Sequence, residues 1–129
     1  MENTISLLKI PVSIGELFDK FSILEIKLEK ILNVNKREKI NTEINELKNY
    51  IDKYQISTEL YMELKNINLR LWEIEDKLRI KESKKEFDDD FISLARSVYF
   101  TNDKRSDKKR EINRLFNSHI EEVKEYIDY

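Results

Sequence analysis

A group of basic side chains near the C-terminal third of the chain could hold an anion. It comprises Arg96, Arg105, Lys108 and Arg110. Arginine presents a planar fork of N–H donors that suits carboxylates and phosphates, and helix N-termini at Ser13 or Asn102 could add backbone N–H groups. Such a site would suit a sugar nucleotide, a phosphate or an acidic partner peptide. The competing interpretation is a mixed-charge surface with local ion pairs and no function.

Two acidic pairs have the spacing found in all-helical, magnesium-dependent nucleotide pyrophosphohydrolases. They are Glu43 with Glu46, and Glu73 with Asp76. That chemistry would need the four carboxylates to converge on hard cations that bridge a triphosphate. At about 100° per residue, Glu46, Glu73 and Asp76 point away from the apolar stripes of their own helices. A solvated acidic face is therefore the favoured interpretation.

Arg114 and His119 match the short R-x(4–6)-H pattern of a class of helical ribonucleases. There the histidine acts as acid or base and the arginine stabilises phosphate charge. His119, however, directly follows a predicted helix cap, where an exposed residue needs no function. Aromatic residues such as Trp72 and Tyr61 lack a basic stripe beside them, which also argues against nucleic-acid binding.

Composition excludes several classes of protein. The chain has 24 Lys and Arg against 26 Asp and Glu, a net charge of -2, so no long-range field attracts nucleic acid or anionic membrane. The absence of cysteine excludes disulfides and thiolate metal sites. No window approaches the roughly 20 apolar residues of a membrane span, and no signal sequence is evident. We expect a cytoplasmic protein without a cofactor.

The spacing of apolar residues predicts an all-α fold. Steps of three and four place them on one stripe of a helix, as in Leu60, Leu64, Ile67, Leu71, Ile74 and Leu78. Only one Gly and one Pro occur among 129 residues, which suits long helices. We expect one domain over residues 1–129, an antiparallel helical hairpin or bundle of four to five helices with coiled-coil-like packing.

Capping signals place the helix ends. Ser13 and Glu16 form a capping box for a helix that runs to about residue 32, after an extended lead over residues 5–12 that should pack on the bundle. A connection at 33–35 precedes a second helix over 36–54. Ser57 or Thr58 should cap a third helix ending near residue 84, and Asp88 a fourth.

Beyond the fourth helix, a second capping box formed by Ser118 and Glu121 predicts a short last helix.

The fourth helix departs from the apolar pattern. Its stripe begins with Phe91, Ala95 and Val98, continues through Asn102, Arg105 and Lys109, and becomes apolar again at Ile112 and Phe116. Polar groups on a buried stripe cost free energy unless they find partners. Either the helix breaks near residues 101–103, where Thr, Asn and Asp are good caps, or these side chains face a polar pocket. The sequence leaves both alternatives open.

Three sequence blocks resemble a family of short bacterial and phage proteins, the domain of unknown function family 6165. They are Pro11–Leu17 with Asp19, Lys20 and Ile23–Lys27; Leu71–Asp76 with Arg79; and Tyr99, Asn102, Asp103, Arg105, Lys108, Ile112 and Asn113. The resemblance covers nearly the whole chain and implies no reaction. It implies that the polar block over residues 99–113 is a hallmark of the family. It also implies a link with surface-polysaccharide genes, beside which members are sometimes encoded.

The leading functional prediction is a non-catalytic helical binding or assembly module, accessory to surface-polysaccharide metabolism by resemblance alone. The alternative is an enzyme or sensor that binds a phosphorylated ligand, a nucleotide or sugar nucleotide, through residues 96–113. The candidate ligand-binding residues are Arg96, Tyr99, Asn102, Asp103, Arg105, Lys108 and Asn113. A ligand site should turn Asn102 and Arg105 inward, beside an acidic residue of the first or third helix.

The partners that we expect are an anionic small ligand or a protein. The apolar stripes are wide, with Phe18, Ile23, Ile26, Tyr61 and Trp72 beside them, and so predict a homodimer through the first or third helix.

Overall fold

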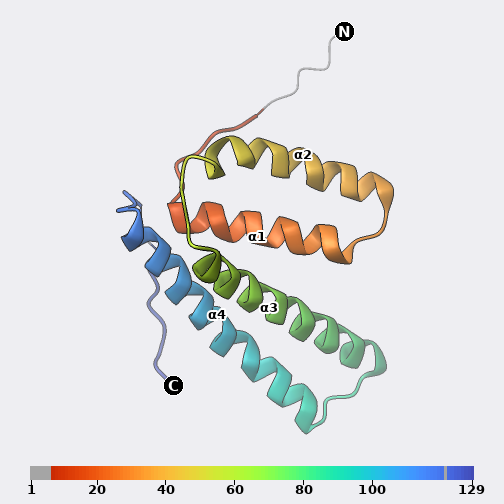
Figure 1. Ribbon diagram of the computed structural model, residues 1–129. Coiled ribbons are helices and arrows are strands. Elements are labelled where there is room, and N and C mark those ends of the chain that lie inside the picture. Colours follow the sequence, from red (N-terminus) through yellow and green to blue (C-terminus); the bar gives the residue numbers. More distant parts are fainter. Residues whose placement is uncertain (1–6, 121) are drawn as a thin grey trace.

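A computed structural model describes residues 7–120 and 122–129 and has four helices and no strand in that part of the chain. α1 spans Ile14–Lys30, α2 Val34–Ile51, α3 Thr58–Lys84 and α4 Asp89–Leu115. The prediction of an all-α fold is confirmed. Consecutive helices run in opposite directions, with α1 beside α2 and α3 beside α4 (Figure 1). None of the described helices is both long enough and apolar enough to cross a lipid bilayer.

Side-chain caps determine where the helices begin. The Ser13 hydroxyl accepts a hydrogen bond from the backbone N–H of Glu16 at 3.0 Å, and Ser57 and Asp88 cap α3 and α4 in the same way. These three caps are as predicted. Asn33 caps α2, so this helix begins earlier than its apolar stripe indicates.

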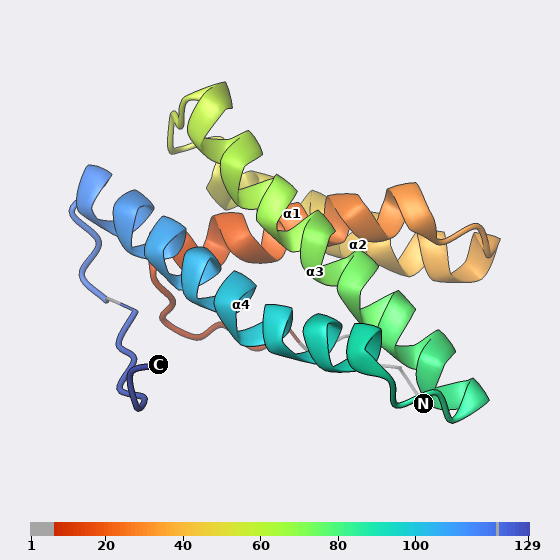
Figure 2. The ribbon, with the colours of Figure 1, turned by 90° about the horizontal axis from the view of Figure 1, so that it is seen from below.

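Two apolar clusters hold the helices together, and α1 takes part in both. Phe18, Leu64 and Ile112 join α1, α3 and α4. A second cluster of Leu24, Ile40 and Ile44 joins α1 to α2. α1 therefore contacts the other three helices, and Figure 2 shows it lying across α3 and α4. This position allows side chains of α1 to meet those of α4.

α4 is unbroken over 27 residues, so the first of the two alternatives, a break near residues 101–103, is wrong. Its polar stripe is accommodated because the stripe meets partners on other elements. Arg105 pairs with one residue of α1, and the buried Lys109 pairs with another. The alternative prediction, that polar side chains of a continuous helix face inward, is the one that the structure supports.

The chain ends differ from expectation. The described residues after α4 contain no helix, and the Ser118 hydroxyl instead accepts a hydrogen bond from the backbone N–H of Ile14 at 3.1 Å. Glu121, the other half of that capping box, lies outside the described residues, as do residues 5 and 6 of the lead. Residues 7–12 are exposed rather than packed on the helices. The C-terminal segment, residues 122–129 and hereafter the tail, turns back beside α4 (Figure 2).

Candidate functional site

A buried ion pair joins α1 to the middle of α4. Arg105 donates through Nε to Asp19 Oδ1 at 2.8 Å and through Nη2 to Asp19 Oδ2 at 2.5 Å. The Asp19 side chain is 1% exposed, whereas that of Arg105 is 28% exposed. This two-point geometry fixes the plane of the guanidinium as well as its position.

Two further residues complete the surroundings of Asp19. Asn68, on α3, donates through Nδ2 to Asp19 Oδ1 at 3.0 Å and to the Ser22 hydroxyl at 2.8 Å. The Ser22 hydroxyl donates to the backbone carbonyl of Asp19 at 2.7 Å. A buried carboxylate is stable only when its oxygens are satisfied. Asn68 of α3 and Arg105 of α4 satisfy the oxygens of the Asp19 carboxylate, and this network therefore orients the Arg105 guanidinium.

Arg105 retains donors for another partner. Its hydrogen bonds to Asp19, more than any other influence, raise the pKa of the guanidinium and so keep it charged although burial opposes this. Among the described residues, Nη1 has no hydrogen-bond partner, and Arg105 lines a cavity. An arginine has five N–H donors, so the guanidinium can bind Asp19 and a second anion together.

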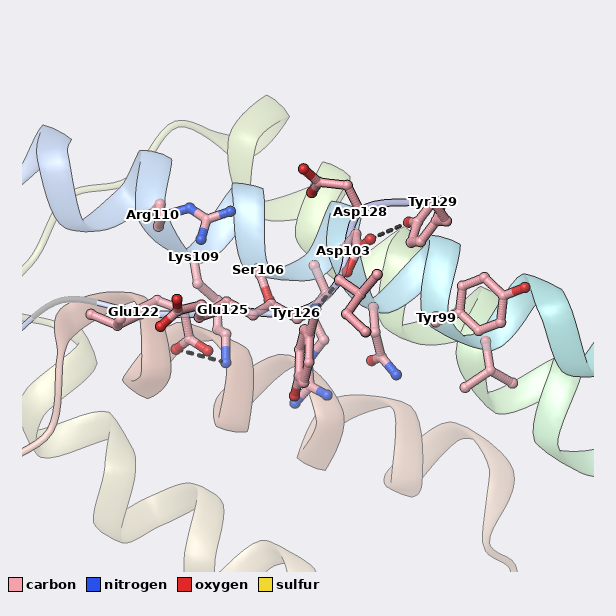
Figure 3. Close-up of a pocket in the computed structure, with 16 residues that line it drawn as sticks. Tyr99, Asp103, Ser106, Lys109, Arg110, Glu122, Glu125, Tyr126, Asp128 and Tyr129 are labelled. Atoms are coloured by element: carbon pink, nitrogen blue, oxygen red, sulfur yellow. Dashed lines mark hydrogen bonds and ion pairs between the residues drawn. The ribbon is translucent and has the colours of Figure 1, made fainter.

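Lys109 lies one helical turn beyond Arg105 and is buried. Its ammonium group is 3.1 Å from a carboxylate oxygen of Glu16, at the start of α1, and 3.2 Å from one of Glu122, in the tail. Figure 3 shows the Lys109 and Glu122 side chains pointing toward each other. A carboxylate from the tail thus occupies the basic wall of α4.

The start of α1 approaches α4 very closely at Gly15. The backbone N–H of Gly15 donates to Asn113 Oδ1 at 2.6 Å. A Cβ atom on Gly15 would lie 2.8 Å from that oxygen and would overlap the backbone carbonyl of Lys109. Only glycine permits this approach, which places Glu16 beside Lys109.

A cavity of about 1000 Å³ lies between α4 and the tail (Figure 3). On α4 its lining includes Tyr99, Asn102, Asp103, Arg105, Ser106, Lys109 and Arg110, and all of residues 122–129 line the other side. The α4 wall is fixed by the contacts to α1, while the opposite wall has no regular secondary structure.

Asp103 holds the far end of the tail. It accepts hydrogen bonds from Lys124 Nζ at 2.6 Å and from the Tyr129 hydroxyl. The first bond, followed by the second, lowers the pKa of the Asp103 carboxyl. The hydrogen bond that Tyr129 donates to Asp103 also raises the pKa of the Tyr129 hydroxyl to about 12. The Tyr129 ring lies 5.3 Å from the ring of Tyr99 and 4.6 Å from that of Phe100.

The structure brings four of the seven candidate residues to one cavity: Tyr99, Asn102, Asp103 and Arg105. Asn113, a residue of α4, is buried against the start of α1, where it binds the backbone of Gly15. Its Nδ2 has no hydrogen-bond partner in the described structure. Lys108 pairs with Glu63 of α3 and with Glu111. Arg96 is exposed beside the ring of Phe100. The last three residues are therefore not part of the cavity lining among the described residues.

Sequence reasoning did not single out Asp19, Asn68 or Ser22 as site residues. Their signal is weak, because a polar residue among apolar helix positions has no partner that the sequence identifies. The structure gives no support to the pyrophosphohydrolase or ribonuclease patterns, because their side chains are exposed: Glu46, Glu73, Asp76 and His119. Within residues 7–120 and 122–129, no group of three or more His, Cys, Asp or Glu side chains could hold a metal ion.

Comparison with known proteins identifies the family. A search of curated proteins and a search of solved structures each give no significant match. A family model, described as a family of unknown function (DUF6165), matches residues 8–128. These residues include α1 to α4 and nearly all of the tail. The chain therefore belongs to the family of unknown function DUF6165.

Proposed function

We propose that the protein is a non-catalytic helical binding module that recognises an anionic group, a carboxylate or phosphate, on the wall of α4. Arg105 and Lys109 would supply the positive charge, and Asn102 a neutral donor beside them. The observation that carries this proposal is the pair of hydrogen bonds from Arg105 Nε and Nη2 to Asp19. They leave Nη1 without a partner among the described residues, on a side chain that lines the cavity.

Preorganisation is the physical reason that this wall is suited to binding. An exposed arginine loses side-chain freedom when it binds an anion, and that loss reduces affinity. Asp19 and Asn68 have already restricted Arg105 in the folded chain. Charge-assisted hydrogen bonds made by such a side chain are therefore stronger than those of a mobile surface residue.

The composition of the cavity favours binding over catalysis. Its described lining contains no histidine or cysteine, and of its four carboxylates those of Asp103 and Glu122 are paired with lysines. The other two, Glu125 and Asp128, belong to the tail, which has no regular secondary structure to fix their position. General acid or base catalysis needs a titratable group within reach of the reacting atoms. The alternative, an enzyme or sensor for a nucleotide or sugar nucleotide, would use the same basic wall and is an outcome of the test below.

Isothermal titration calorimetry with inorganic phosphate, glutamate, nucleotides and sugar nucleotides tests the proposal. A hydrogen bond to a charged group contributes about 1.5–3 kcal/mol, so Lys109→Gln should weaken anion binding about 10-fold or more. Lys104→Gln is the matched control because Lys104 is an exposed residue of the same helix. Equal affinities for the two variants, with helicity unchanged by circular dichroism, would contradict the proposal. Turnover of a nucleotide would instead favour the enzyme.

Three narrower predictions accompany this proposal. Homodimerisation through α3 is favoured over α1, because Phe18 and Ile26, two of the residues that suggested a dimer, are buried within the chain. Light scattering that shows a monomer at high concentration would exclude either interface. The coiled-coil-like packing and the role beside surface-polysaccharide metabolism stay predictions, the latter from resemblance alone.

A further inference from the structure

We propose that the ligand of this site is an acidic, tyrosine-bearing segment of a partner protein, and that the tail occupies the site as a built-in competitor. The inference rests on the anion site proposed above and names both its ligand and its regulation. It follows from the way in which residues 122–129 lie against α4 (Figure 3).

The charges of the tail complement those of the wall. Three basic residues and one acidic residue of α4 line the cavity, Arg105, Lys109, Arg110 and Asp103. The tail presents the reverse, three acidic residues and one basic, Glu122, Glu125, Asp128 and Lys124. The one basic residue of the tail, Lys124, pairs with the one acidic residue of this α4 wall, Asp103, at 2.6 Å. At the other end, the acidic Glu122 of the tail pairs with the basic Lys109 of α4. This double match specifies direction along the groove as well as net charge.

The tyrosine is recognised through both its ring and its hydroxyl. The Tyr129 ring packs edge-on against Phe100 and at a tilt against Tyr99, an arrangement that favours aromatic side chains. Its hydroxyl donates to Asp103. A phenylalanine would retain the ring contacts and leave one lone pair of Asp103 unused, so the site distinguishes tyrosine from phenylalanine.

The contacts extend too far for a single small anion. They run from Lys109 to Tyr99, ten residues along α4, which is about 15 Å at 1.5 Å per residue. A phosphate or one carboxylate would satisfy only the Lys109 end. An extended peptide reaches both ends of the groove, as the tail does through Lys109 and Asp103.

The tail is held weakly, whereas the wall is held firmly. Val123, Tyr126 and Ile127 are each more than 75% exposed, and no backbone–backbone hydrogen bond joins the described tail to α4. Ion pairs between partly exposed groups contribute about 0–1 kcal/mol each. The wall, in contrast, depends on buried contacts to α1. A partner segment can therefore displace the tail without unfolding the groove.

Fluorescence anisotropy of a labelled peptide with the sequence of residues 117–129, added to the full chain, tests the inference. A tethered segment competes at an effective concentration in the mM range, so the wild-type chain should bind the peptide weakly. Glu122→Gln with Tyr129→Ala in the chain removes two tail contacts and should tighten peptide binding about 10-fold. Val123→Ala is the matched control, since that side chain is 85% exposed.

Two further measurements separate the groove from a non-specific effect. In the tail-weakened background, Asp103→Asn removes one partly exposed ion pair and should weaken peptide binding about 5-fold. A peptide with phenylalanine at the final position should bind less tightly than the native peptide. Unchanged affinity in the tail-weakened chain, or indifference to Asp103→Asn, would overturn the inference. Phosphate binding that depends on Lys109 without peptide binding would leave the proposed function standing and refute this extension of it. Failure of both ligands would refute both proposals.

Discussion

Asp19 and Arg105 lie 86 positions apart in the sequence, yet their side chains meet through two hydrogen bonds in the interior. The pair joins the first half of α1 to the middle of α4, at the point where the apolar stripe of α4 becomes polar. Because Asp19 is 1% exposed, it depends on Arg105, Asn68 and water-excluding neighbours for its charge to be tolerated. The same pair stabilises the fold and orients the candidate binding group.

Removal of Arg105 should destabilise the chain strongly. Arg105→Ala leaves a buried carboxylate without its cation, which typically costs about 3–5 kcal/mol. Urea unfolding followed by circular dichroism measures the loss. The control is Lys20→Ala, because the Lys20–Glu43 pair is exposed, with side chains 56% and 44% accessible, and should contribute less than about 1 kcal/mol. Similar losses for the two variants would show that the buried pair has no special role.

Replacement of both partners should be less harmful than the sum of the single changes. The double change Asp19→Leu with Arg105→Met removes the Asp19 carboxylate, which Arg105→Ala alone would leave buried without a cation. Buried pairs are often replaced by apolar residues at little cost. A double-mutant cycle should therefore show a favourable coupling of about 1–3 kcal/mol between the sites. Strict additivity would argue against an interaction between Asp19 and Arg105 in solution.

Gly15→Ala should destabilise the protein although alanine favours helices. The new Cβ would lie 2.8 Å from Asn113 Oδ1 and still closer to the Lys109 carbonyl, and such overpacking costs about 1–3 kcal/mol. That exceeds the gain of about 1 kcal/mol in helix propensity. Thermal unfolding should show a lowered Tm. Asn41→Ala, on the exposed face of α2, should leave Tm nearly unchanged, and a raised Tm for Gly15→Ala would count against this close approach.

Docking of the tail should depend on pH at both extremes. The pKa of Asp103 is lowered by Lys124 and then by Tyr129. Its contribution is thus complete above the ordinary aspartate value of about 4 and is lost as pH falls through the lowered value. The pKa of Tyr129 is raised to about 12 by its bond to Asp103. The tyrosine contribution is therefore complete below about 10 and is lost as pH rises through about 12.

NMR spectra of the Tyr129 ring protons should consequently show full contacts with Phe100 and Tyr99 from about pH 4 to about pH 10. These contacts should weaken progressively as pH falls through the lowered pKa of Asp103, and again as pH rises through about 12. Asp103→Asn removes the carboxylate and should abolish the acidic transition. Contacts that persist unchanged in the Asp103→Asn variant would show that the tail docks without this carboxylate.

The helices were predictable because their signals are local. The spacing of Leu60, Leu64 and Ile67 and the cap at Ser57 act within one or two turns, and the structure has a helix there. The continuity of α4 was not predictable, because polar residues of its stripe pair with Asp19 and Glu16 of α1, and no local pattern reveals these pairings. The tail shows the same limit. Ser118 has the sequence of a helix cap, but its hydroxyl binds Ile14, 104 positions away.

The candidate site was predictable in part for the same reason. Asn102 and Arg105 stood out because they interrupt an apolar stripe, and a continuous helix directs them inward. Lys108 and Arg96 carry the same positive charge as Arg105 but do not line the cavity. Lys108 pairs with Glu63 of α3, and Arg96 lies over the ring of Phe100. Charge clusters in a sequence do not reveal on which side of a helix each member lies until the neighbouring helices are in place.

NMR of the Arg105 guanidinium is the most direct test of the central claim, that a buried carboxylate holds this group ready for an anion. If the claim is correct, the Nε–H signal of Arg105 exchanges slowly, lies far from that of exposed arginines, and shifts when phosphate or the tail peptide is added to the tail-weakened chain. Arg70 and Arg79 are exposed. An Arg105 signal that resembles theirs, and that does not shift when either ligand is added, would contradict the claim.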